Sequence, residues 1–110
     1  MKPDLQPLMN NTKWDELRLA MYELQPSPKW RTCDAQSGYV SNWDGDWFYH
    51  FRAGGYEWIL WAELLIESDE QRRLVLAELV RIGLPGYESD GNLVVVGYSE
   101  SGQVIDYFSA

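Results

Sequence analysis

The sequence has little of what several classes of functional site require. Among 110 residues it holds one cysteine, Cys33, and one histidine, His50. An internal disulfide is therefore excluded, and a metal or nucleophilic site would have to be built around single side chains. The glycines fall at turn-like positions, without a phosphate-binding pattern such as G-x-G-x-x-G. We expect no catalytic, cofactor-binding or metal-binding residue, no cofactor, and a protein that is not an enzyme.

Long apolar runs are missing as well. No stretch approaches the roughly 18 apolar residues that a membrane span needs. The N-terminal segment carries two prolines and an aspartate where a secretory signal would need an apolar run. Together with the unpaired cysteine, these absences lead us to expect a soluble protein of the cytoplasm that has no membrane partner.

Positive charge is scarce. Nine Lys and Arg residues stand against 17 Asp and Glu, giving a net charge of −8, and residues 34–71 alone hold eight acids and one arginine. Such a field repels phosphate backbones and attracts basic surfaces, so we expect no nucleic-acid partner and favour a protein partner with a basic surface. The alternative is that the charge only keeps a chain with six tryptophans soluble.

Two segments of the sequence have the pattern of helices. In the first, Thr12 offers an N-cap, and apolar residues recur at helical spacing from Trp14 to Leu24. The second begins with a capping box over residues 68–71 and stops at Gly83. Both segments are long enough to form helices that pack through one apolar face.

The remaining regular segments have the composition of strands. They are residues 29–33, 38–42, 46–52, 56–66, 93–98 and 104–108. Asp44-Gly45 has the composition of a two-residue hairpin turn between two of them. We predict a flexible N-terminal tail over residues 1–11 and a single α+β domain over residues 12–110. This domain is expected to be a mainly antiparallel sheet of about six strands with two helices packed on one face.

Alternation along the strands suggests where a binding face lies. In the segment 46–52, the alternate residues Trp47, Tyr49 and Phe51 are assigned to the core. If this segment pairs with residues 56–66, the opposite side chains share an acidic face with aromatic patches. Four tryptophans, Trp14, Trp30, Trp47 and Trp58, are expected in the core. The candidate partner-binding residues are Trp43, Asp44, Asp46, Phe48, His50, Glu57, Trp61 and Glu63.

The acids of this segment also allow two chemical interpretations. Asn42, Asp44 and Asp46 alternate as the oxygen ligands of calcium loops do, but Trp47 and Ala53 stand where an EF-hand needs Gly and Glu. Acid pairs could serve glycoside hydrolysis if a cleft held them at the right separation. Alternate acids are common on exposed strands, so a turn or a solvated face is the simpler interpretation.

Several motifs of the chain resemble those of a known family. They are Trp30-Arg31, Gly38-Tyr39, residues 43–49, Gln71-Arg72 and residues 102–107. Over about residues 12–108 the chain resembles a family of short bacterial proteins that is catalogued only as a domain of unknown function. In size, acidity and tryptophan content it is also similar to bacterial immunity proteins, which neutralise toxin domains. Neither resemblance implies a catalytic residue.

The expected function is therefore that of a non-enzymatic acidic binding protein of the bacterial cytoplasm. An immunity protein that neutralises a basic toxin domain is the finer hypothesis. One alternative is a small carbohydrate- or metabolite-binding domain that uses Trp43 and Trp61 as platforms. Another is a homodimer of structural role, in which a second copy of the chain covers the outer sheet face.

Overall fold

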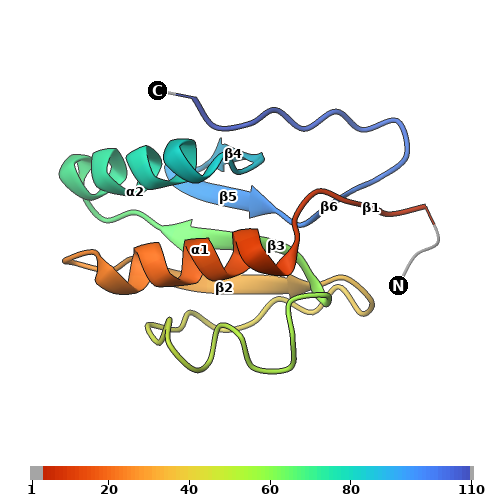
Figure 1. Cartoon of the computed structure of the whole chain (residues 1–110), viewed down its shortest axis with the longest axis horizontal. Coiled ribbons are helices and arrows are strands. Elements are labelled where there is room, and N and C mark those ends of the chain that lie inside the picture. The colour runs from red at the N-terminus through yellow and green to blue at the C-terminus, as the bar shows by residue number, and fades with distance from the viewer. Residues whose placement is uncertain (1–3, 110) are drawn as a thin grey trace.

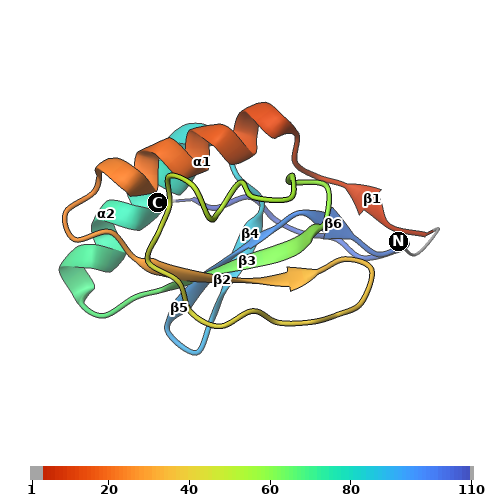
Figure 2. The same ribbon diagram turned by 90° about the horizontal axis from the view of Figure 1, so that it is seen from below.

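The computed structural model describes residues 4–109, which form two helices and six strands. The strands make two antiparallel sheets, one of four strands in the order β2-β3-β5-β4 and one that pairs β1 with β6 (Figure 1). In chain order the elements are β1 (Gln6–Pro7), α1 (Asn11–Glu23), β2 (Lys29–Asp34), β3 (Ile59–Leu65), α2 (Asp69–Ile82), β4 (Gly86–Ser89), β5 (Asn92–Val96) and β6 (Tyr98–Ser99). The predicted α+β class is confirmed. Figure 2 shows α1 and α2 on the same side of the four-stranded sheet.

Side-chain caps fix where the two helices begin. Asn10, rather than the expected Thr12, caps α1, because its Oδ1 accepts the backbone N–H of Lys13 at 2.8 Å. Ser68 caps α2 as predicted, and its Oγ accepts the backbone N–H of Gln71 at 3.0 Å. The helix ends, also as predicted, at the left-handed glycine that follows Ile82.

The core lies between the helices and one face of the four-stranded sheet. Alternate residues of β3 face it, with Ala62 and Leu64 fully buried. Trp58 precedes β3 and is 40% exposed, so its assignment to the core is wrong. The buried cluster includes Trp14, Leu17, Met21, Trp30, Trp47, Phe51, Leu64, Val75, Leu79, Leu84, Leu93 and Val95.

The C-terminal part of the sheet differs from the prediction. Asp90 and Gly91 both have positive φ, +50° and +83°, and join β4 to β5 in a two-residue hairpin. No strand is predicted over residues 86–89, where β4 forms. Residues 104–108, predicted as a strand, form only an isolated bridge at Tyr107. The predicted strand 93–98 is divided at Gly97, after which β6 pairs with β1.

Residues 35–58 form a long irregular segment beneath β2 (yellow-green in Figure 1). The strands predicted at 38–42 and 46–52 are absent, and Asp44-Gly45 is not a hairpin turn. Aspartate side chains capture the backbone N–H groups that a strand would present to its neighbours: Oδ1 of Asp44 accepts from Asp46, and Oδ1 of Asp46 accepts from Phe48 and Tyr49. The chain therefore turns here instead of extending.

The packing of this segment follows a helix-like period rather than a strand period. Trp47 and Phe51, four residues apart, are 1% and 3% exposed, whereas Tyr49 between them is 64% exposed. The core assignment of Tyr49 is therefore wrong. The Trp47 indole N–H donates to the carbonyl of Pro28 at 2.7 Å, and that of Trp30 donates to the carbonyl of Asp46 at 3.0 Å.

Irregular segments lie along both edges of the four-stranded sheet. Beside β2, Trp30 and Asp44 exchange backbone hydrogen bonds of 2.9 and 2.8 Å. At the β4 edge, the backbone N–H of Gly86 donates to the carbonyl of Asp106 at 2.9 Å. Each edge strand thus has part of its outer hydrogen-bonding row occupied by the same chain.

The predicted tail is partly built into the fold. Residues 1–3 lie outside the described part of the chain, but Leu5 is buried, Gln6–Pro7 form β1, and Asn11 already belongs to α1. The backbone N–H of Leu8 also donates to the carbonyl of Gly97 at 2.9 Å.

Two glycines test this description of the backbone. A Cβ on Gly97 would lie 2.2 Å from the backbone oxygen of Ile59, so Gly97→Ala should lower the free energy of unfolding by about 2 kcal/mol or more in urea titrations. Gly45 has open space around it and no positive φ, so Gly45→Ala should change that free energy by less than about 0.5 kcal/mol. A large loss of stability in Gly45→Ala would instead favour a hairpin turn at Asp44-Gly45.

Candidate functional site

The eight candidate partner-binding residues fall into three separate places. The expected pairing of residues 46–52 with 56–66 does not occur, because β3 pairs with β2 and β5. Asp44, Asp46, Phe48 and His50 gather on the segment 35–58. Trp61 and Glu63 lie on the outer face of β3. Arg31 pairs with Glu63 and also lies over the ring of Trp43, which places Trp43 near the same face. Glu57 stands apart from both groups, and its carbonyl accepts the hydroxyl of Tyr98 at 2.6 Å.

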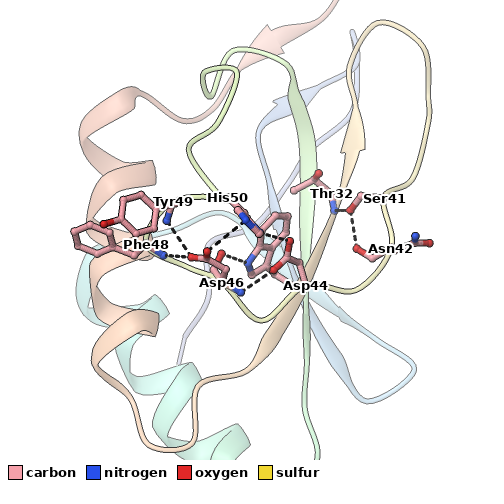
Figure 3. Close-up of polar contacts among 9 residues, drawn as sticks. Thr32, Ser41, Asn42, Asp44, Asp46, Phe48, Tyr49 and His50 are labelled. Atoms are coloured by element: carbon pink, nitrogen blue, oxygen red, sulfur yellow. Dashed lines mark hydrogen bonds and ion pairs between the residues drawn. The ribbon is translucent and has the colours of Figure 1, made fainter.

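His50 lies between two carboxylates (Figure 3). Its Nδ1 is 2.8 Å from Oδ2 of Asp44, and its Nε2 is 3.5 Å from Oδ2 of Asp46. The imidazole remains 62% exposed. Because the two turns made by Asp44 and Asp46 set the path of the backbone, the same side chains that shape the segment also position the imidazole.

The two carboxylates change the proton affinity of the imidazole. The hydrogen bond with Asp44 raises the pKa of His50, and the negative charges of Asp44 and Asp46 raise it further. The pKa of Asp46 is lowered, first by the backbone N–H of Tyr49, and also by that of Phe48 and by the charge of His50. The cluster therefore favours the protonated form of His50 and the ionised form of Asp46.

The geometry of the hydroxyl and thiol groups differs from that of a catalytic triad. The hydroxyl of Ser41 donates to the carbonyl of Asn42 at 3.1 Å and accepts the backbone N–H of Thr32 at 3.0 Å. The Cys33 thiol is buried beside the carbonyl of Gly38, and burial raises its pKa. Both nitrogens of His50 are directed to carboxylates, so the imidazole acts as a charge and a hydrogen-bond donor.

Exposed aromatic rings adjoin the histidine cluster. The ring of Phe48 lies 5.2 Å from that of Tyr22 on α1 and 4.8 Å from that of Tyr49. The two tyrosines are 51% and 64% exposed. The Arg18 guanidinium fixes this part of the segment, since Nη1 donates to the carbonyl of Phe48 at 2.8 Å. We call Tyr22, Asp44, Asp46, Phe48, Tyr49 and His50 the loop surface.

Sequence reasoning missed the two tyrosines of the loop surface. Tyr22 lies one helical turn after the buried Arg18, so the two side chains share one face of α1. This spacing could have placed Tyr22 near the groups that Arg18 contacts. Tyr49 was assigned to the core because a strand period was applied to residues that do not form a strand.

On the outer sheet face, Glu63 has its own partners within the chain. Its Oε1 accepts Nε of Arg31 at 2.8 Å, and its Oε2 accepts the amide of Asn92 at 2.9 Å. The Arg31 guanidinium also lies 4.5 Å from the ring centre of Trp43. Glu63 is only 8% exposed. This acid therefore contributes little free negative charge to an outer binding face.

The described part of the chain offers neither a membrane-spanning helix nor a group of metal ligands. Neither of its helices has both the length and the apolar content to cross a bilayer. Among residues 4–109, no three His, Cys, Asp or Glu side chains are placed so that they could hold a metal ion.

The chain matches a known family model. The model of a "Family of unknown function (DUF6678)" matches residues 1–102. No curated protein and no solved structure matches the chain.

The charge of His50 can be measured directly, because it is the only histidine. We expect its pKa, followed by NMR of the ring protons, to lie above the ordinary 6.5. Asp44→Asn should lower it more than Asp46→Asn, because Asp44 provides the closer contact. Equal shifts in the two variants would contradict this ranking.

The raised pKa of His50 also sets the sign of a stability change. A group whose pKa is higher in the folded state stabilises the fold below its unfolded pKa, and this contribution is lost as pH rises through the folded value. The contribution of His50 should therefore be complete below about pH 6.5 and vanish above its raised pKa. In urea titrations across this pH window, the free energy of unfolding of His50→Gln should lack this pH-dependent contribution.

The ion pair on the outer face should matter more than an exposed one. Glu63→Ala leaves the amide of Asn92 and the guanidinium of Arg31 without their partner, so we expect the free energy of unfolding to fall by about 1–3 kcal/mol. Glu88→Ala removes a 2.6 Å pair with Arg72 whose side chains are 48% and 37% exposed, and should cost less than about 1 kcal/mol. Chemical denaturation compares the two, and equal losses would contradict the structural role of Glu63.

Proposed function

Since the chain belongs to this family of unknown function, its role must be inferred from its own surface, and we propose that it is a non-enzymatic acidic binding protein whose loop surface contacts a basic protein partner. The expected resemblance to a family without known activity is confirmed. Its bacterial and cytoplasmic character stays a prediction. Two helices, six strands and one continuous core provide the support for the surface.

The proposal depends on one observation. Exposed aromatic rings lie beside two carboxylates that share the imidazole of His50 as their partner. Asp44 and Asp46 are paired with His50, whereas Glu70 and Glu78 on α2 are each paired with an arginine. An arginine or lysine of a partner can replace the imidazole as the counter-ion of the two carboxylates. The adjoining tyrosines offer rigid apolar area, which suits the anchors of protein interfaces.

The net charge supports the same partner chemistry. A chain of net charge −8 attracts a basic surface over a distance, and complementary charges increase the rate of encounter more than the final affinity. The carboxylates would then increase the rate of association, and the aromatic rings would lengthen the lifetime of the complex.

A finer proposal is that the partner is a toxin domain, which would make the chain an immunity protein. Its support is compositional, namely small size, acidity and six tryptophans. Growth of cells that co-express the chain with a toxin domain encoded beside it tests this version.

The homodimer alternative receives less support than the sequence suggested. Val94 and Val96 on the outer face of β5 are 4% and 5% exposed within one chain, and Glu63 already has its partners. The apolar content of this face is thus largely covered without a second copy.

The binding proposal predicts a charge effect confined to the loop surface. Asp44→Asn with Asp46→Asn preserves the oxygen that accepts each backbone N–H and removes both charges. We expect stopped-flow association with an arginine- and lysine-rich peptide to slow about three- to tenfold at low salt, with a flatter salt dependence.

The matched control removes the same charge elsewhere. Glu16→Gln with Asp106→Asn alters two exposed acids that make no side-chain hydrogen bond among the described residues. Equal slowing in both double variants would show that only net charge matters. No binding of the peptide by the unmodified protein would contradict the proposal itself.

A further inference from the structure

A recess of about 280 Å³ lies between β2 and the segment of residues 35–58, next to the loop surface. Buried apolar groups line its floor, among them Trp30, Phe51 and Ile59. Two aromatic side chains, Tyr39 and Trp58, line its exposed part and are 66% and 40% exposed. The volume lies just below the range of about 300–1,000 Å³ for small-ligand sites, which are typically apolar with a few fixed polar groups.

The polar groups of the recess have unused hydrogen-bonding capacity. The hydroxyls of Thr32 and Tyr39 and the indole N–H of Trp58 make no hydrogen bond with any residue that the structure describes. Asp34 uses Oδ1 for the backbone N–H groups of Gln36 and Ser37, both at 2.8 Å, and its carboxylate borders the recess. The recess thus offers both donors and acceptors beside aromatic faces.

The charges that line the recess favour a neutral ligand. One carboxylate, from Asp34, and one imidazole, from His50, have opposite signs. The backbone N–H groups of Ser37 and Gln36 lower the pKa of Asp34, so this carboxylate remains ionised at neutral pH. A net charge of −8 repels anions, and the imidazole held between Asp44 and Asp46 opposes a cation at the same site.

We propose that this recess binds a small neutral polyhydroxylated ring, either a free monosaccharide or the terminal ring of a glycan. The C–H face of such a ring packs on an aromatic side chain, while its hydroxyls both donate and accept hydrogen bonds. Trp58 and Tyr39 supply the aromatic faces, and Thr32 and Asp34 supply polar partners. The proposal does not depend on a basic protein partner.

The position of the tryptophans separates this site from the one expected from the sequence. Trp43 and Trp61 are the sugar platforms that the sequence predicts, but Trp43 covers the Arg31 guanidinium, and Trp61 lies on the outer face of β3. Neither of them lines the recess. Trp58, which had been assigned to the core, takes their place.

Titration with sugars tests the assignment. Glucose, galactose, mannose and N-acetylglucosamine, together with the trisaccharides of each, are added at millimolar concentrations while backbone and indole NMR signals are followed. We expect saturable shifts at Thr32, Tyr39 and Trp58 with at least one of these sugars. Binding of monosaccharides identifies a free-sugar site, and binding of trisaccharides alone identifies a glycan end; both outcomes support the proposal.

Matched variants locate the binding. Tyr39→Ala removes an exposed ring that makes no ring contact with another aromatic residue of the described chain, so it should weaken affinity about five- to tenfold without unfolding the protein. Trp58→Ala should weaken it at least as much, whereas Trp43→Ala and Tyr87→Ala should leave it unchanged. No saturable shift with any sugar, or equal weakening by Trp43→Ala, would overturn the assignment, and neither result bears on the peptide measurement.

Discussion

The burial of Trp47 is the interaction on which both candidate surfaces depend. Its indole is almost wholly enclosed and donates to the carbonyl of Pro28, which precedes β2, so it attaches an irregular segment to the sheet and core. Phe51 enters the same cluster one helical turn later, 4.6 Å from the Trp47 ring. A hydrogen bond at the end of a large buried ring fixes both position and orientation. The side chains between and beside these two anchors are therefore displayed in a fixed arrangement.

Anchoring by Trp47 also explains why one short stretch of sequence serves two surfaces. Phe48 lies on the side that faces Tyr22 of α1, while Trp58, beyond Phe51 in the sequence, lines the recess. His50 belongs to both places, since it contacts the two aspartates and also lines the recess. A ligand in either place would therefore lie near the same imidazole.

Local signals in the sequence were sufficient for the helices and for three strands. Ser68 and the glycine after Ile82 define the ends of α2, and the alternation of Ala62 and Leu64 identifies the buried face of β3. The segment 35–58 could not be predicted in this way, because aspartate side chains satisfy its backbone and a helical spacing buries its aromatic residues. Arg31 and Glu63 lie far apart in the sequence, so only the register of β2 against β3 reveals that they meet. Four of the eight candidate residues were nevertheless brought together, because they are neighbours on one turn-rich segment.

The covering of both sheet edges has a consequence for the behaviour of the chain in concentrated solution. Exposed edge strands are templates on which further strands add, and sequences rich in aromatic and β-branched residues are the most prone to this association. Here the stretch after β2 lies along one edge through Asp44, and the C-terminal stretch lies along the other through Asp106. Irregular backbone thus blocks part of each edge against the addition of a further strand, with neither an extra strand nor a second subunit.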